Sequence, residues 1–344
     1  MLDPSYNERR IALAKYGGCV TESGLRPRML LATDFSRFSE GAEAYACSLA
    51  ASWGATVTVL SVLEFHPGMN ADYPVNRLYL GELMKGATKQ FIELKARAAK
   101  RGVTVHTSVT TGIPSEAVLA AAKTDDMDLI VVGTKGKTGL EHVLLGSTAE
   151  RIIRMAPCPV LAVPAEMQEG EGGSGDPNRP AVLERILVPI DFSDCSLDAV
   201  EYAVLVAQRG KASIKLLHVL EPVSYGLDFT LLHVTKREQM RKAITERLSS
   251  LVSALTSAEV TSEFLIRGGL PADSILDAAL TQPADLIVMG THGHRGLSHA
   301  FFGSVVESVL RKARCPVLTV RSPKFHASHR RVTPVASTPT PTNP

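Results

Sequence analysis

The chain has 344 residues, of which 45% are hydrophobic and 21% charged, so it suits a globular protein of two domains. Its 37 basic and 35 acidic residues leave a net charge of +2, which argues against a nucleic-acid partner for the chain as a whole. No apolar run is long enough to span a membrane, and the first residues lack the apolar core of a secretory signal. These features predict a cytoplasmic protein.

In chain order, an N-terminal extension (residues 1–25) precedes short apolar runs that alternate with longer helical patterns. The helical stretches, such as 39–54 and 78–102, repeat apolar residues three and four apart and end in glycine, a common helix C-cap. The runs between them are rich in β-branched residues and flanked by Pro, Gly or Asp, which predicts strands. These strands are expected at 28–34, 55–64, 103–112, 128–134 and 158–164.

Strands that are apolar on both faces and alternate with helices predict an α/β fold. We expect a Rossmann-like, doubly wound parallel sheet of five strands, with helices on both faces. Ligands of such sheets bind at the carboxyl ends of the strands, near the point where the strand order reverses.

The second part of the sequence repeats the first at a constant offset of 157 residues. LLATDFS returns as LVPIDFS, DLIVVGT as DLIVMGT, and CPVLAV as CPVLTV. Two such domains are therefore predicted, each with its own five-stranded sheet. The expected division is domain 1 at 26–164, a flexible Gly/Glu/Pro-rich linker at 165–182, domain 2 at 183–321, and a disordered basic Pro/Thr-rich tail at 322–344.

A glycine-containing segment follows the fourth predicted strand of each domain. GTKGKTGLEHVLLGST occupies 133–148 and GTHGHRGLSHAFFGSV occupies 290–305. Gly133 and Gly136 predict a sharp turn out of the sheet with positive φ, and a backbone that a ligand approaches closely. Neither GxxxxGK[ST] nor a GxGxxG after the first strand is present.

The end of that segment predicts a phosphate site. Gly146, Ser147 and Thr148 begin a predicted helix, whose unpaired N–H groups and positive dipole end suit phosphate, and Ser147 adds a hydroxyl. Val305 replaces the hydroxyl of Thr148 in the second domain, so the two sites are expected to differ. The corresponding residues there are Gly290, Gly293, Gly303, Ser304 and Val305.

An aspartate ends the first strand of each domain, Asp34 and Asp191, and each is followed by Phe-Ser. A carboxylate at a strand end can accept from ribose hydroxyls or an adenine amine. The rival role is as the N-cap of the next helix, and Ser36 or Ser193 could equally provide that cap.

A strand ending in Asp, a G-x2-G-x9-G-[ST] segment after strand four and a last strand CPVLxV resemble the universal stress protein (UspA) family in both domains. The chain thus looks like a tandem universal stress protein, with the adenine nucleotide alpha hydrolase-like fold. Family members with this glycine pattern bind ATP, so the resemblance implies ATP, with or without Mg²⁺, as the ligand. It assigns the adenosine pocket to Asp34 and Val62 in domain 1 and to Asp191 and Val219 in domain 2, and ribose and phosphates to the glycine segments.

The resemblance also implies partners. Family folds pair through the last strand, so the two CPVLxV strands are expected to join the domains as an internal pseudo-dimer, and would otherwise leave an exposed edge. A homo-oligomer and an unidentified regulatory protein partner are further expectations. The predicted role is a non-catalytic, nucleotide-dependent regulator of a stress response.

Two alternatives remain open from sequence. The first is slow ATP hydrolysis or phosphate transfer, with His142 or His299 as the base; few acids lie in the loops to support it. The second is an interaction scaffold with vestigial pockets. A zinc site at His292, His294 and His299 lacks a fourth ligand.

The cysteines predict no disulfide or redox site. They are odd in number, far apart and without a CxxC pair, so reduced thiols are expected. The five are Cys19, Cys47, Cys158, Cys195 and Cys315.

Overall fold

The structure is a computed structural model that describes residues 26–64, 73–136, 145–165, 183–221, 231–293 and 303–321, with backbone only for 231–237. The predicted N-terminal extension, nearly all of the linker and the tail lie outside the described residues. Within those ranges, no helix has the length and apolarity needed to cross a membrane.

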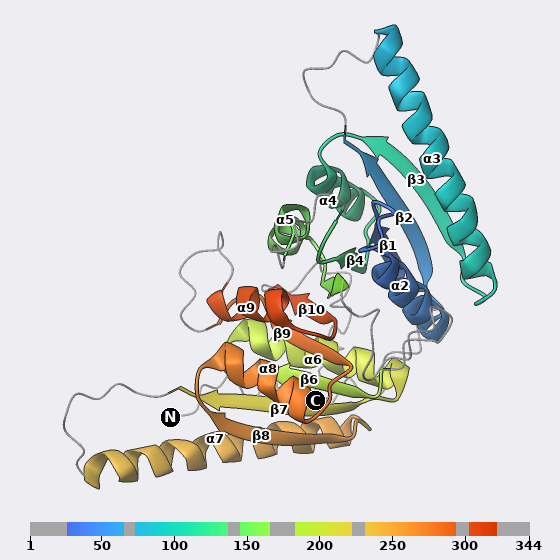
Figure 1. The fold of residues 1–344 in the computed structure, drawn as a ribbon. Helices are drawn as coiled ribbons and strands as arrows, with labels where there is room; N and C mark the ends of the chain where they lie inside the picture. The colour runs from blue at the N-terminus through green and yellow to red at the C-terminus, as the bar shows by residue number, and fades with distance from the viewer. Residues whose placement is uncertain are drawn as a thin grey trace, which may run out of the picture.

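Strands and helices alternate in both halves, as the sequence predicts (Figure 1). The first half contains β1 (Arg28–Ala32), α2 (Glu40–Trp53), β2 (Thr56–Leu63), α3 (Pro74–Ala99), β3 (Val105–Thr111), α4 (Pro114–Thr124), β4 (Leu129–Gly133), α5 (Ser147–Met155) and β5 (Val160–Val163). The second contains β6 (Arg185–Pro189), α6 (Asp194–Gly210), β7 (Ser213–Leu220), α7 (Leu231–Ser257), β8 (Ser262–Gly268), α8 (Pro271–Thr281), β9 (Leu286–Gly290), α9 (Ser304–Lys312) and β10 (Val317–Val320).

The two sets of five strands form one continuous sheet of ten, in the order β3-β2-β1-β4-β5-β10-β9-β6-β7-β8. Pairing within each half is parallel, and the halves meet where β5 and β10 pair antiparallel, with Leu161 opposite Leu318. The expected pairing of the two last strands is therefore present. Because each last strand covers the edge of the other, neither edge is left open at the centre of the molecule.

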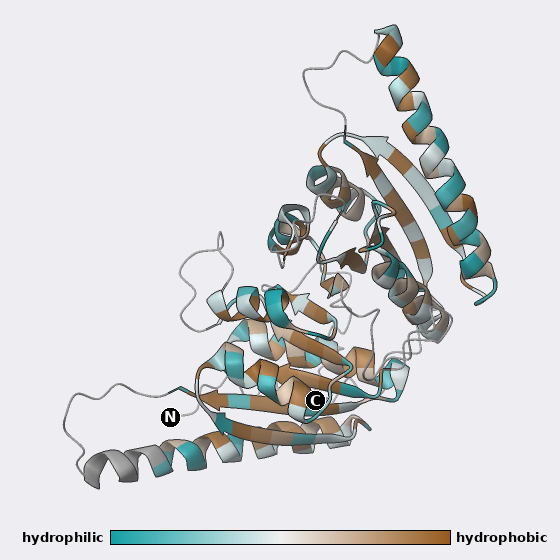
Figure 2. Ribbon diagram, viewed as in Figure 1, coloured by the Kyte–Doolittle hydropathy of each residue, from teal (hydrophilic) through white to brown (hydrophobic). Residues whose placement is uncertain are grey.

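Side chains from alternate strand positions feed two apolar cores, one on each face of the sheet. Met29 and Leu31 pack with α2 and α3 on one face, whereas Leu30 packs with α4 and α5 on the other. Each core continues across β5 and β10 into the second half. Figure 2 shows the central strands largely brown, which marks the hydrophobic centre of the sheet.

Reciprocal hydrogen bonds also join the halves. The Tyr45 hydroxyl donates to the Asp285 carbonyl at 3.3 Å, and the Tyr202 hydroxyl donates to the Asp128 carbonyl at 3.1 Å. Tyr202 lies 157 residues beyond Tyr45, and Asp285 lies 157 residues beyond Asp128, so the same two positions are joined in both directions. The two halves therefore pack as a symmetric pair within one chain.

Two local expectations were wrong. The outer strands β3 and β8 contain half-buried and exposed residues but no fully buried one, because each lies at an edge of the sheet and is not apolar on both faces. The helix expected to end in Gly102 ends earlier: Lys100 is the C-cap of α3, and Gly102 takes a positive φ of 70° in the turn that follows. Gly54 does cap α2 in the left-handed conformation.

Candidate functional site

The first candidate site lies at the carboxyl edge of the parallel strands, where β1 and β4 are neighbours. Asp34 follows β1, and Gly133 ends β4. A Cβ built on Gly136 would be 3.0 Å from Asp34 Oδ2, so the glycine backbone lies directly against the carboxylate. Residues that are about a hundred positions apart thus meet at this edge.

Helix α5 starts beside the same loop. Gly146 N–H donates to the Thr134 carbonyl at 2.8 Å, and Thr134 N–H donates to Val163 at the end of β5. These bonds tie the exit of β4 to the first turn of α5, in which Ser147 is exposed. Gly146 is the N-cap, and glycine has no side chain that could accept from the first N–H groups of the helix. The start of α5 therefore presents donors and a positive dipole end toward the loop.

The second half repeats this arrangement more tightly. A Cβ on Gly293 would be 2.6 Å from Asp191 Oδ2, and one on Gly290 would be 2.7 Å from the carbonyl carbon of Cys195. Gly303 is the N-cap of α9, and its N–H donates to the Thr291 carbonyl at 3.2 Å. Ser304 is exposed in the first turn of α9.

The valines assigned to the adenosine pocket lie on the middle strands. Val62 is on β2 and Val219 on β7, each near the carboxyl end of its strand. Both are partly buried and pack against the apolar core beneath α4, α5, α8 and α9. Thr148 and Val305 are both half-buried in the first turn of their helices, and Val305 packs against that same core.

The prediction of positive φ at Gly133 and Gly136 was wrong. Left-handed glycines among the described residues are Gly54, Gly102, Gly112 and Gly269. Gly133 and Gly136 are instead needed for space: a Cβ on Gly133 would be 3.1 Å from the Phe38 carbonyl oxygen, and one on Gly136 would be 3.0 Å from Asp34 Oδ2. At these positions close approach, and not an unusual backbone angle, excludes a side chain.

At the candidate sites, the residues with the unusual angle are Phe35 and Phe192, with φ of 56° and 65°. A bulky residue in this region carries strain that the surrounding structure must hold. Both follow the site aspartate directly, and the repeated Asp-Phe-Ser was the sequence signal that could have marked them. The left-handed residue reverses the chain, so that the aspartate stays at the edge while the phenylalanine returns to the core.

Neither aspartate caps the next helix. Asp34 Oδ1 accepts from Ser36 N–H at 2.9 Å, and Asp191 Oδ1 accepts from Ser193 N–H at 2.9 Å. The N-cap of α2 is Ser39, and the N-cap of α6 is Ser193, whose hydroxyl accepts from Ser196 N–H at 3.3 Å. Each carboxylate therefore shapes its own turn with one oxygen, and its other oxygen lies toward the glycine loop.

Several predicted features fall outside the described residues. These are the candidate bases His142 and His299, and His294 of the zinc hypothesis. Within the described part of the chain, no group of three His, Cys, Asp or Glu side chains is placed to hold a metal ion. The described cysteines Cys47, Cys158, Cys195 and Cys315 are free thiols.

The arrangement is that of an α/β protein with two glycine-lined candidate sites at the carboxyl edge of one sheet. The universal stress protein family matches the chain twice, over residues 26–164 and 183–321. The chain therefore belongs to the universal stress protein family, as a tandem protein with two such domains.

Individual relatives agree. A universal stress protein of Methanocaldococcus jannaschii is 35% identical over 146 residues, which cover 42% of this chain and 86% of that protein. One from Synechocystis sp. is 28% identical over 322 residues and covers 85% of this chain and 99% of its own length. The crystal structure of a universal stress protein from Archaeoglobus fulgidus shares the fold, with a TM-score of 0.63, 22% identity and coverage of 86% of this chain and 96% of that one.

Proposed function

We propose that each half binds one ATP at the carboxyl edge of the sheet. In the first half, Asp34 would accept hydrogen bonds from the nucleoside, with Val62 against the base. Gly133 and Gly136 would approach the ribose and phosphates. Phosphate oxygens would accept from the start of α5, at Gly146, Ser147 and Thr148.

The second site would use the equivalent residues. Its phosphate contacts would rest more on backbone N–H groups, because Val305 brings no hydroxyl where the first site has Thr148. The contributing residues would be Asp191, Val219, Gly290, Gly293, Gly303, Ser304 and Val305.

The observation that carries this proposal is the contact between glycine backbone and aspartate in both halves. Gly136 and Gly293 lie so close to Asp34 and Asp191 that a methyl group would collide with the carboxylate at 3.0 and 2.6 Å. A space lined by glycine, next to a carboxylate and a glycine-capped helix start, fits a ligand with both hydroxyls and phosphates.

We propose that the protein is a regulator and not an enzyme. Magnesium, if bound with ATP, would be held mainly by phosphate oxygens and water. Nucleotide occupancy would change the surface offered to a regulatory protein or to further copies of the chain. Such a role needs differential binding between two states, and not a placed catalytic base.

The test is to denature the purified chain and measure the nucleotide that it releases, after saturation with Mg-ATP and removal of free ligand. Two ATP per chain are expected in the wild type, and one each in Gly146→Tyr and Gly303→Tyr. Tyrosine at either position would fill the space at the helix start while the other half stays intact as an internal control. Release of two ATP from both variants would contradict the assigned sites.

A further inference from the structure

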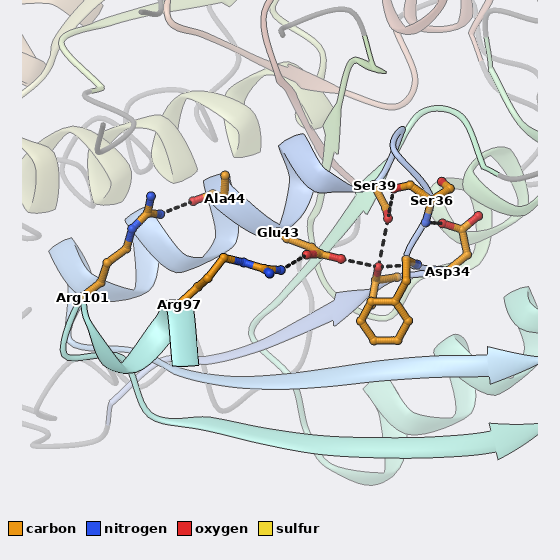
Figure 3. Close-up of polar contacts among 9 residues, drawn as sticks. Asp34, Ser36, Ser39, Glu43, Ala44, Arg97 and Arg101 are labelled. Carbon is orange, nitrogen blue, oxygen red and sulfur yellow. Dashed lines mark hydrogen bonds and ion pairs between the residues drawn. The ribbon is translucent and has the colours of Figure 1, made fainter. Parts of the chain in front are cut away.

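A buried polar chain links helix α3 to the turn that carries Asp34. Thr33 Oγ1 donates to Glu43 Oε1 at 2.8 Å, and Arg97 Nη2 donates to Glu43 Oε2 at 3.0 Å (Figure 3). The Glu43 side chain is 7% exposed, whereas that of Arg97 is 55% exposed. A chain of hydrogen bonds thus runs from exposed Arg97 on α3, through buried Glu43 on α2, to Thr33 at the end of β1.

Thr33 passes this link on to the turn. Phe35 N–H donates to Thr33 Oγ1 at 3.0 Å, within the same turn in which Asp34 accepts from Ser36 N–H. Thr33 Oγ1 has one hydrogen and two acceptors within reach: Glu43 Oε1 and, at 3.0 Å, Ser39 Oγ, which itself donates to the Ser36 carbonyl. The carboxylate is the stronger acceptor, so the hydrogen goes to Glu43 and the Thr33 lone pairs face Phe35 N–H. Glu43 therefore orients the acceptor that holds Phe35 in its left-handed conformation.

The second half has no equivalent of this chain. At the offset of 157 residues, Ile190, Val200 and Ala254 replace Thr33, Glu43 and Arg97. Ile190 is 3% exposed, Val200 0% and Ala254 8%, so hydrocarbon fills the same region. The turn after β6 nevertheless has the same backbone form, although the carboxylate that α6 buries, Asp198, is at a different position. The turn therefore does not require a carboxylate at the position of Glu43.

Burying a carboxylate costs more free energy than burying an apolar side chain at the same position. Burial raises the pKa of Glu43, and the Thr33 hydrogen bond and the Arg97 charge only partly oppose that rise. Replacing a buried ion pair with apolar residues is often neutral or stabilising. Stability alone therefore does not explain the buried Glu43 carboxylate. A role in setting the geometry of the adjacent first site does explain it.

We propose that Glu43 is a positioning residue for the first site: through Thr33 it fixes the Asp34–Phe35–Ser36 turn, and through Arg97 it couples that turn to α3. The proposal rests on the proposed nucleotide site for its functional consequence. The ligand affinity of the first site would then depend on the position of α3 relative to α2. The ligand affinity of the second site would not depend on such a link.

The first test needs no ligand: amide hydrogen exchange of Phe35 and its neighbours in the free protein. Glu43→Leu removes the carboxylate acceptor of Thr33, so that the hydroxyl turns toward Ser39 Oγ, and should raise the exchange rate of the Phe35 amide by about fivefold to tenfold relative to β1 core amides. Glu43→Gln keeps an acceptor oxygen and should stay within about twofold of wild type. Unchanged Phe35 exchange in Glu43→Leu would overturn the proposal, even if the global stability fell.

The second test measures affinity for ATP in a Gly303→Tyr background, in which the first site is read alone. Glu43→Leu should weaken binding by about fivefold to tenfold, with rescue in Glu43→Gln. The same substitution in a Gly146→Tyr background should leave the second site unchanged. Equal loss at both sites would mean a general structural effect and overturn the proposal.

The two tests separate two kinds of failure. Faster Phe35 exchange in a protein that binds no ATP at either site would retain the positioning role and reject the proposed function. Normal ATP binding with Phe35 exchange unaffected by Glu43→Leu would retain the proposed function and reject the positioning role.

Discussion

The turn after β1 and the turn after β6 share a backbone form and differ in what supports it. Phe35 packs edge-on against Phe91 of α3, with ring centroids 5.1 Å apart, and the Thr33–Glu43–Arg97 chain lies beneath it. Phe192 instead lies under the guanidinium of Arg247 from α7, 3.8 Å from the ring centroid, and beside His218.

This difference shows which part of a duplicated fold is constrained. Both halves keep the aspartate, the left-handed residue after it and a glycine that approaches the carboxylate, and the aspartate and the glycine lie at the candidate ligand edge. The groups behind them differ in charge, size and hydrogen bonding. The form of the turn is therefore the constrained feature. Different sets of core residues behind the turn can stabilise that form.

The largest effect is expected from equivalent glycines with different clearances. Gly290→Ala would place a methyl group 2.7 Å from backbone and side-chain carbons of Cys195, whereas Gly133→Ala would meet the Phe38 carbonyl oxygen at 3.1 Å. Since backbone cannot move aside cheaply, Gly290→Ala should destabilise the second half by about 1–3 kcal/mol, and Gly133→Ala the first half by less. Urea unfolding followed separately in each half by hydrogen exchange would measure both, and equal losses would contradict the difference in packing.

A smaller effect is expected from Arg97→Ala, which leaves the buried Glu43 carboxylate without its ion pair. Because Arg97 is 55% exposed and water can partly replace it, the loss should be about 1 kcal/mol and confined to the first half. Lys95→Ala, an exposed position on the same helix, is the matched control. A loss no greater than in that control would mean that the ion pair adds nothing.

The smallest expected effect is a loss of stability of the second half at acidic pH, which follows from the pKa of His218. Burial lowers the pKa of His218 and Arg247 lowers it further, while the hydrogen bond to the Ile190 carbonyl and the charge of Asp191 raise it. With the folded-state pKa below the unfolded value of 6.5, the second half should lose stability as the pH falls through the folded-state pKa.

The first half suggests the variant that tests this pH dependence, because Ser61 is the residue equivalent to His218. His218→Ser should therefore flatten the dependence of the second-half unfolding midpoint on pH between neutral and mildly acidic conditions. An unchanged slope in His218→Ser would assign the pH dependence to another group.

Much of the fold could be predicted because it rests on local pattern and repetition. Alternating apolar runs define the strands, the constant offset reveals the two halves, and the family resemblance implies the pairing of β5 with β10. The sequence could not separate the two uses of glycine, since a positive φ and a close backbone approach call for the same residue. Only the packing of Gly136 on Asp34, about a hundred residues away, distinguishes them.

The supporting groups were missed for a related reason. Glu43 lies in a helix with one other acidic residue, Glu40, and nothing in its own segment marks it as buried beside Thr33. Arg97, its partner, is on another helix. Phe35 looks like an ordinary core residue, because a left-handed φ leaves no trace in a single sequence beyond the repeated Asp-Phe-Ser.

The most direct test of the central claim is equilibrium dialysis of the full chain against labelled Mg-ATP, which counts the nucleotides bound at saturation. Two sites per chain are predicted, one for each glycine-lined edge. Absence of saturable binding would contradict the account and leave two well-formed edges that need a different ligand.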